Sequence, residues 1–388
     1  MHIAYTAEQE ALRQELRAYF AALMTPEVEA EVAVGNTGGP HCLEAVRRMG
    51  RDGWLGIGWP KEYGGQGRSE IEQFIFYDEA WRTLAPIPAL TINTVAKTIM
   101  QFGTDEQKDF FLPTIVKGEL HFAIGYTEAN AGTDLASLKT RAVRDGDEWV
   151  INGQKLYTSL AAYADYIWLA ARTDPEAPKH KGISIFCVPT KSPGFSWTTI
   201  HTIVPAGTTA TYYEDVRVPH KFLVGGENRG WKLITNQLNY ERVSLCPPGM
   251  VERVFEDTVE WARTEKLADG SRVIDREWVR IQLARVRAKI EFLRLINWKV
   301  ASGDINPGDA SATKVFGTEF FCEAYRTLLE IIGQAGTLRL GSRGAVLKGR
   351  LERAYQGTLF LTFGGGTNEI QRDLIALFGL GMPRVPRF

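Results

Sequence analysis

Apolar residues recur at helical spacing through the first third of the chain. In the first such run they stand three or four positions apart: Leu12, Leu16, Phe20 and Leu23. Thr6 with Gln9 three residues later is typical of a helix start. Similar patterns predict helices over 71–82 and 105–117. We therefore expect residues 1–122 to form an N-terminal α-helical domain.

The pattern changes after residue 122, where short alternating or β-branched runs replace the helical spacing. Asp145-Gly146 and Asn152-Gly153 are turn signals that we expect to separate such runs. The runs themselves are Trp149–Ile151, Tyr166–Leu169, Ile183–Val188 and Thr211–Tyr213. Several short strands with few helix signals predict a small β-barrel or sandwich in residues 123–227.

Helical spacing returns near residue 228 and continues toward the end of the chain. One long helix is predicted over 279–302, with a single buried stripe of Val279, Leu283, Val286, Ile290, Leu293 and Ile296. The chain is thus predicted to be an α+β multidomain protein in the order helical, β, helical, with its last domain at 228–388.

The composition is that of a globular protein with room for two or three domains, since the chain has 388 residues, 44% of them hydrophobic and 23% charged. A formal net charge of −1 provides no basic field for nucleic acid or anionic membrane. We see neither a secretory signal nor an apolar run long enough to span a bilayer. Four scattered cysteines and six unpaired histidines lead us to expect no metal site and a reducing, cytoplasmic location.

The segment Gly125-Tyr126-Thr127-Glu128-Ala129-Asn130-Ala131-Gly132-Thr133-Asp134 carries the strongest chemical signal. Its small residues would let a flat ligand lie against the backbone, and its hydroxyls offer hydrogen-bond donors, although the residues alone also allow an ordinary polar turn. The segment resembles the flavin loop of the acyl-CoA dehydrogenases, a T-E-x-x-x-G-[ST]-D run. This resemblance implies that Tyr126, Thr127 and Thr133 bind FAD and that Thr133 also meets the substrate.

A second segment, Gly153 to Ser159, resembles another flavin-binding stretch of the same family. The resemblance places Tyr157 near the flavin ring and Ser159 at its reactive edge, with Thr158 between them as a further cofactor contact. Taken alone, Tyr157 could equally be an ordinary strand aromatic. Because the resemblance covers essentially the whole chain, it also implies the family's fold, with a middle β-barrel and a C-terminal four-helix bundle.

Glu241 is the candidate catalytic base. It falls on the same side of a predicted helix as Ile234, Leu238 and Leu245, and a carboxylate on an apolar stripe has a raised pKa and is a stronger base. The residues alone leave open an ion pair with Arg242 or a solvated acid at the edge of the stripe. Glu241-Arg242 resembles the E-R pair that carries the base in isovaleryl-CoA and long-chain enzymes, and we assign Arg242 to the substrate.

Most of the family carries its base in a later Y-E-G-T segment, which here contains Gly364-Gly365-Gly366-Thr367-Asn368-Glu369. Gly365 stands at the glutamate position, so no base can act from there. Side chains are missing at Gly364 and Gly365, which we assign to the substrate because their absence favours a bulky acyl group. Gly366, Thr367 and Glu369 are assigned to FAD, since Thr367 would begin a helix whose N-terminus can hold a dinucleotide's polar groups.

The reaction implied is α,β-dehydrogenation of an acyl-CoA thioester, with Glu241 removing the α-proton and flavin N5 accepting the β-hydride. An acyl-CoA oxidase and a non-catalytic subunit of a mixed oligomer remain alternatives. We assign no residue to the CoA nucleotide and expect electron-transfer flavoprotein or a similar acceptor.

Two segments that homotetrameric members lend to a neighbour's FAD are degraded. Residues 263–270 lack the R-x-x-F element, and Glu330 opens the stretch that matches Q-x-x-G-G-x-G-[YF]. A carboxylate there would repel a diphosphate. We therefore expect a homologous second subunit in an α2β2 heterotetramer. In this the chain resembles the base-bearing subunit of actinobacterial steroid side-chain acyl-CoA dehydrogenases.

Overall fold

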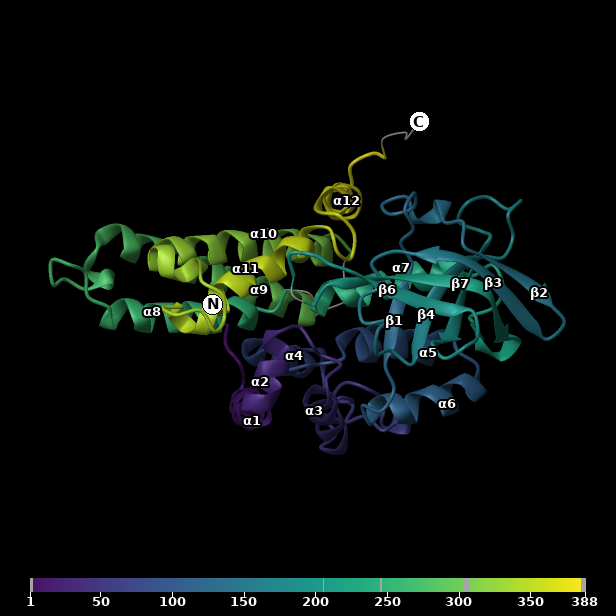
Figure 1. Cartoon of the computed structure of the whole chain (residues 1–388), viewed down its shortest axis with the longest axis horizontal. Coiled ribbons are helices and arrows are strands. Elements are labelled where there is room, and N and C mark those ends of the chain that lie inside the picture. Colours follow the sequence, from purple (N-terminus) through teal and green to yellow (C-terminus); the bar gives the residue numbers. More distant parts are fainter. Residues whose placement is uncertain (1–2, 205, 245, 303–306, 385–388) are drawn as a thin grey trace. The chain divides into compact units, whose positions relative to one another are not determined.

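The computed structural model describes residues 3–204, 206–244, 246–302 and 307–384, with the backbone alone in 238–244. It begins with a helical region (Figure 1) that comprises α1 (Ala7–Leu23), α2 (Pro26–Ala33), α3 (Pro40–Arg51), α4 (Glu70–Thr83), α5 (Ala96–Phe102) and α6 (Asp105–Val116). The predicted helix start is confirmed: the Gln9 N–H donates to Thr6 Oγ1 (3.2 Å) and the Thr6 N–H to Gln9 Oε1 (3.0 Å). A π-helical turn, Leu90–Val95, leads directly into α5.

The described residues in the middle of the chain form one sheet of eight strands. They are β1 (Phe122–Gly125), β2 (Arg141–Asp145), β3 (Glu148–Lys155), β4 (Tyr166–Arg172), β5 (Ile183–Pro189), β6 (Phe195–Ile200), β7 (Thr208–Pro219) and β8 (Leu223–Val224). Hydrogen-bonded neighbours follow the order β6-β7-β3-β2-β4-β5-β8, and β1 pairs with β4 in parallel. All four predicted runs lie in strands.

One predicted turn is correct and the other is wrong. Asp145 and Gly146 stand at the bend between β2 and β3, where Gly146 has a φ of +60°. Asn152 and Gly153 instead lie inside β3, where the register with β7 shifts between Ile151 and Gly153. A bulge uses the same conformational freedom of glycine as a turn, so the two cannot be told apart from the dipeptide.

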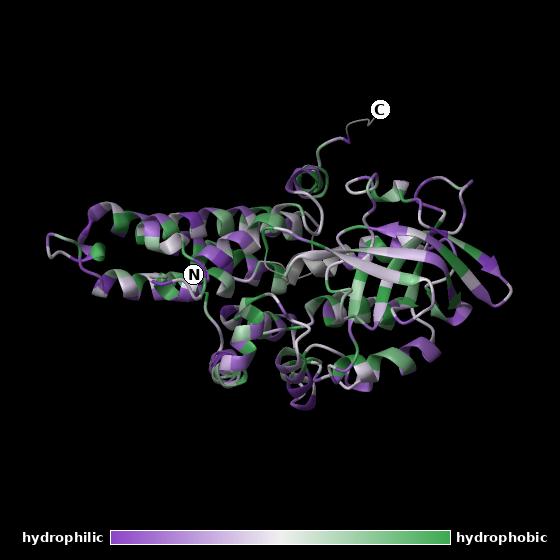
Figure 2. Ribbon diagram, in the orientation of Figure 1, coloured by the Kyte–Doolittle hydropathy of each residue, from purple (hydrophilic) through white to green (hydrophobic). Residues whose placement is uncertain are grey.

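The central strands of the sheet, β4 and β5, are buried in an apolar core. All of Ile167–Ala171 and Ile183–Val188 are buried, and these strands are among the hydrophobic, green segments in Figure 2. The Trp149 and Phe186 rings pack with centroids 5.3 Å apart. Runs that are buried on both faces explain why β4 and β5 show no alternation in sequence.

The last part of the chain is helical. Its helices are α7 (Gly230–Ser244), α8 (Gly249–Thr264), α9 (Glu277–Ala301), α10 (Pro307–Ile332), α11 (Arg350–Thr358) and α12 (Asn368–Leu374). Helices α8, α9 and α10 pack around one core (Figure 1). The stripe predicted on α9 is confirmed, because Val279, Leu283, Val286, Ile290 and Leu293 are all buried and Ile296 packs against them.

Contacts group the described residues into two compact units. One unit holds Met1–Glu29, Ser69–Ala85 and Arg242–Phe388, so that α1 and α4 join the C-terminal helices. The other holds Ala30–Arg68 and Pro86–Glu241, so that α3, α5 and α6 join the sheet. The order helical, β, helical is confirmed, whereas the boundaries at 122 and 227 stay predictions.

Among the described residues, every helix is too short or too polar to cross a bilayer.

Candidate active site

The loop that follows β1 holds the predicted flavin segment. Glu128 and Ala131 exchange two backbone hydrogen bonds of 3.1 Å, which close a tight turn. Thr127 is half-buried before this turn, whereas Thr133 and Asp134 are exposed after it. A Cβ added at Gly132 would meet nothing within 4 Å, so this part of the loop borders open space.

Buried charge holds the loop in place. Lys155 Nζ donates to Tyr126 O (3.0 Å) and to Glu128 Oε1 (2.8 Å). The N–H groups of Lys139 and Thr140 donate to the same carboxylate at 2.7 and 2.8 Å. Burial acts to raise the pKa of Glu128, but Lys155 and the backbone donors outweigh it and the pKa is lowered. Burial also lowers the pKa of Lys155 to about 8, against the opposing effect of Glu128.

The second predicted flavin segment starts in the last three residues of β3 and continues into the turn that follows. Leu156 donates its N–H to Thr127 O (2.8 Å), which joins this segment to the first loop. Tyr157 has a φ of +58° and is 60% exposed. Ser159 is exposed and its hydroxyl pairs with that of Thr208 (2.9 Å). A large aromatic residue held in the left-handed region is strained, and such strain is common at functional sites.

Thr158 differs from its two neighbours because its side chain is fully buried. Its hydroxyl pairs with that of Thr211 (3.2 Å), and its backbone exchanges hydrogen bonds with Thr209. The side chain of Thr158 therefore anchors the turn from within. Its assignment to the cofactor stays a prediction.

Tyr126 is also buried, and its hydroxyl belongs to a small polar cluster. The hydroxyl donates to Gln237 Oε1 (2.5 Å), and Trp168 Nε1 lies 3.0 Å from both oxygens. An indole N–H can only donate, so the Gln237 atom that faces it is the oxygen. Gln237 Nε2 is buried and finds no hydrogen-bond partner among the described residues. Sequence reasoning missed Gln237, which looks like any polar residue on a helix.

Helix α7 carries the predicted base. Ile234, on the predicted apolar stripe, is buried. The side chains of residues 238–245, which include Glu241 and Arg242, lie outside the described residues. The assignments of Glu241 to proton removal and of Arg242 to the substrate stay predictions.

The glycine segment forms a turn before α12. Gly365 and Gly366 have φ values of +68° and +96°. Thr367 caps α12 as predicted, since its Oγ1 accepts a hydrogen bond from the Ile370 N–H (3.3 Å). Glu369 is exposed on the first turn of that helix.

A buried lysine that sequence reasoning missed holds this turn. Lys314 on α10 is 0% exposed, and its Nζ donates to Thr362 O (3.1 Å), Gly366 O (2.9 Å) and Asn368 Oδ1 (2.7 Å). Gln371 Nε2 donates to Gly365 O (3.2 Å). The backbone carbonyls of Gly365 and Gly366 thus have side-chain donors within the same unit, which fix the conformation of the turn.

The structure brings the two flavin segments of the sheet unit together, through the hydrogen bond from Leu156 to Thr127 and the contacts of Lys155. The glycine turn belongs to the other unit, which holds the C-terminal helices.

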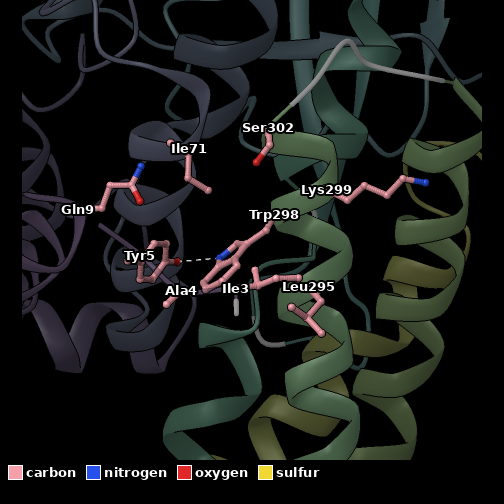
Figure 3. Close-up of a pocket in the computed structure, with 9 residues that line it drawn as sticks. All are labelled: Ile3, Ala4, Tyr5, Gln9, Ile71, Leu295, Trp298, Lys299 and Ser302. Atoms are coloured by element: carbon pink, nitrogen blue, oxygen red, sulfur yellow. Dashed lines mark hydrogen bonds between the residues drawn. The ribbon is translucent and has the colours of Figure 1, made fainter. Parts of the chain in front are cut away.

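A cavity of about 380 Å³ in the unit of the C-terminal helices lies between the N-terminal arm and α9 (Figure 3). None of the predicted site residues lines it, and Tyr5 and Trp298, joined by a 3.0 Å hydrogen bond, form part of its wall.

Three family models match successive parts of the chain. They describe the N-terminal domain (residues 6–119), the middle domain (123–216) and the C-terminal domain (228–379) of acyl-CoA dehydrogenases. The chain belongs to the acyl-CoA dehydrogenase family. This confirms the resemblance and the three-domain fold inferred from sequence.

Individual relatives match this acyl-CoA dehydrogenase over its full length. Acyl-CoA dehydrogenase FadE26 of Mycobacterium tuberculosis is 58% identical over 100% of both chains. A chain of the ChsE4–ChsE5 complex of the same organism is 59% identical, with a TM-score of 0.94 over 99% of this chain and 100% of that one. A chain of the Tcur3481–Tcur3483 steroid acyl-CoA dehydrogenase is 52% identical, with a TM-score of 0.93 over 99% and 100%.

Proposed function

We propose that this acyl-CoA dehydrogenase uses FAD to introduce a double bond between the α and β carbons of a bulky acyl-CoA thioester. Tyr126, Thr127, Thr133, Tyr157, Thr158, Ser159, Gly366, Thr367 and Glu369 are the residues that would hold the cofactor. When bound, FAD supplies the acceptor for the hydride that leaves the β-carbon. Thr133, Tyr157 and Ser159 are all exposed. Two hydroxyl donors beside an aromatic ring fit a flat heteroaromatic ligand.

Glu241 is the proposed base. A thioester α-proton is only weakly acidic, so a carboxylate in apolar surroundings is suited to remove it. The observation that carries the choice of position 241 is Gly365, because the alternative family position has no side chain. Arg242 and Thr133 would bind the substrate, with Thr133 on its thioester side. The reaction also needs donors on the thioester oxygen, where negative charge develops.

The proposed acyl group is a steroid side chain. Gly364 and Gly365 leave the wall of the turn without side chains, and Gly365 occupies a conformation that favours glycine. The 52% identity to a steroid acyl-CoA dehydrogenase favours the same substrate class. Electron-transfer flavoprotein or a similar protein is our proposed electron acceptor.

The proposed assembly is an α2β2 heterotetramer with a homologous second subunit. Arg263 lies in the last turn of α8 without a phenylalanine three residues later, and Glu330 is exposed on α10. Two relatives of high identity are chains of the ChsE4–ChsE5 complex and of the Tcur3481–Tcur3483 steroid acyl-CoA dehydrogenase, which favours a mixed assembly here.

Anaerobic mixing with a steroid side-chain acyl-CoA tests the reaction. We expect the flavin absorbance to bleach, and Glu241→Gln to slow bleaching at least about 100-fold, because the variant lacks the base. Glu227→Gln changes an exposed glutamate just before α7 and should bleach like the unaltered protein. Bleaching of Glu241→Gln at the rate of the unaltered protein would reject the assigned base.

The two alternatives predict other results. A non-catalytic subunit would hold no flavin that acyl-CoA bleaches, even beside its partner. An oxidase would reoxidise rapidly with O2 and form hydrogen peroxide at the rate of turnover. A dehydrogenase should instead turn over only when electron-transfer flavoprotein or an artificial dye is present.

A further inference from the structure

Lys155 and Glu128 form a buried ion pair that the proposed reaction does not use. The Lys155 side chain is 0% exposed and that of Glu128 is 12% exposed. Removing these charges from water is costly, and an ion pair of this kind is often no more stabilising than apolar residues of similar volume. General stability is therefore a weak explanation for the pair.

The contacts of Lys155 reach the two residues that flank Thr127. Its Nζ donates to Tyr126 O on one side and to Glu128 Oε1 on the other. The next residue, Leu156, donates its N–H to Thr127 O. Three consecutive loop residues are therefore attached to Lys155, the last residue of β3, and to Leu156, which follows it. The loop cannot rotate at Thr127 without breaking one of these bonds.

Glu128 extends the attachment to the far side of the loop. Its carboxylate accepts hydrogen bonds from the N–H groups of Lys139 and Thr140, which precede β2. The ammonium of Lys155 thus lies at the centre of a network that reaches from β1 to β2. Tyr157, in its left-handed conformation, follows two residues after Lys155.

We propose that Lys155 is a positioning residue that fixes Thr127 relative to Tyr157 and Ser159. The two segments would then present one preformed surface to the isoalloxazine ring, so this inference rests on the proposed cofactor function. A preformed site binds its ligand more tightly because no loop has to lose conformational entropy when the ligand binds.

The electrostatics of the pair agree with this role at neutral pH. Burial lowers the pKa of Lys155 to about 8, Glu128 acts to raise it and Arg172 acts to lower it further. In the described part of the chain, Glu128 and Arg172 are the charged groups whose fields act on this ammonium. The charge-assisted bonds should therefore be present at pH 7 and weaken as the pH rises above about 8.

The test compares Lys155→Met with Lys179→Met. Lys179 also bonds to this loop, through Asp134 Oδ2 (2.8 Å), but both side chains are about 60% exposed, so its ion pair should matter little. Because Lys155→Met leaves a buried carboxylate short of a partner, the double variant Lys155→Met/Glu128→Gln serves as a second, charge-free version. Each protein, assembled with its partner subunit where it needs one, is stripped of flavin and titrated with FAD.

Two readouts together decide the proposal. We expect Lys155→Met and the double variant to bind FAD at least about tenfold more weakly, with faster amide exchange at Glu128, Ala131 and Leu156 in the flavin-free protein. Lys179→Met should change neither readout. In the unaltered protein FAD affinity should fall above pH 8, and this fall should be absent without Lys155.

Unchanged FAD affinity in the folded double variant would overturn the positioning role, even if its melting temperature fell. Faster amide exchange without weaker FAD binding would also overturn it, because Lys155 would then order the loop without increasing the affinity for FAD. A result in which the unaltered protein takes up no FAD at all would contradict the proposed function instead.

Discussion

At the scale of single residues, Asp78 shows how the fold sets the chemistry of a side chain. It lies in α4, 6% exposed, and its Oδ1 accepts a hydrogen bond from the Gly249 N–H (2.6 Å). Burial raises its pKa to about 7, and the nearby carboxylates of Glu252 and Glu79 add to this. The Gly249 N–H and Arg294 act in the opposite direction but do not cancel it.

We predict that Asp78→Asn stabilises the protein at alkaline pH. The pKa is about 7 in the folded chain and 3.8 when unperturbed. The stabilising effect of the protonated form is thus fully present below about pH 3.8 and lost as the pH rises through 7. An asparagine keeps the acceptor oxygen without acquiring charge. Denaturant unfolding should show a gain for the variant that is larger at pH 8.5 than at pH 5, by up to a few kcal/mol, because the loss for the unaltered protein is complete only above about pH 7.

Asp147→Asn, in the exposed bend after β2, is the control and should be equally stable relative to the unaltered protein at both pH values. Equal effects of Asp78→Asn at pH 5 and 8.5 would mean that Asp78 does not change its charge in this range.

The residues that sequence reasoning missed have a common physical cause. Lys155, Gln237 and Lys314 are polar side chains whose principal partners are backbone carbonyls or residues distant in sequence. Isolated lysines and glutamines usually lie at the surface, so nothing in the local pattern sets these apart. Thr127 and Gly365 could be assigned because a contiguous motif carries them. The network that holds them in place could not.

At the scale of elements, the predictions that succeeded rest on periodicity and local capping. The stripe on α9 and the cap at Thr6 depend only on nearby residues, and both are confirmed. The turn predicted at Asn152-Gly153 is wrong because the pairing of β3 with β7, more than 50 residues away, absorbs the glycine as a bulge. Long-range pairing is information that no local window contains.

The glycine turn before α12 leads to a prediction about stability. Gly366 has a φ of +96°, and a Cβ there would lie 2.8 Å from Gln371 Nε2, which is hydrogen-bonded to Gly365 O. A side chain at this position is strained and would displace that donor. Gly366→Ala should therefore lower the free energy of unfolding by about 1–2 kcal/mol or more, measured by thermal or denaturant unfolding.

Gly357→Ala provides the matched control. Gly357 lies inside α11, and an added Cβ would meet nothing within 4 Å. Alanine there should raise helix stability by about 0.5–1 kcal/mol. Equal effects of the two substitutions would show that the turn is not constrained by its backbone conformation.

At the scale of the whole molecule, α9 carries a second apolar row beside its buried stripe. Trp278, Ile281, Phe292 and Leu295 are 43–49% exposed and follow a heptad spacing that Arg285 and Ala288 interrupt. Rows of exposed apolar residues on a helix usually mark an interface with another chain. Together with the degraded segments at 263–270 and 330–337, this row favours a protein that is complete only beside a partner.

We predict that the chain alone is poorly soluble or flavin-poor, and that co-expression with a homologous subunit corrects both defects. The partner should retain an R-x-x-F element after its own α8 and a Q-x-x-G-G-x-G-[YF] segment, because these supply the positive charge and the glycines that the FAD diphosphate needs. Size-exclusion chromatography with light scattering would give the mass of the assembly, and absorbance the ratio of FAD to protein. Replacing the partner's arginine by methionine should lower that ratio without separating the chains. A stable homotetramer of this chain alone, with one FAD per subunit, would contradict the prediction, because the exposed Glu330 and the segment without R-x-x-F would then have to serve a neighbour's diphosphate unaided.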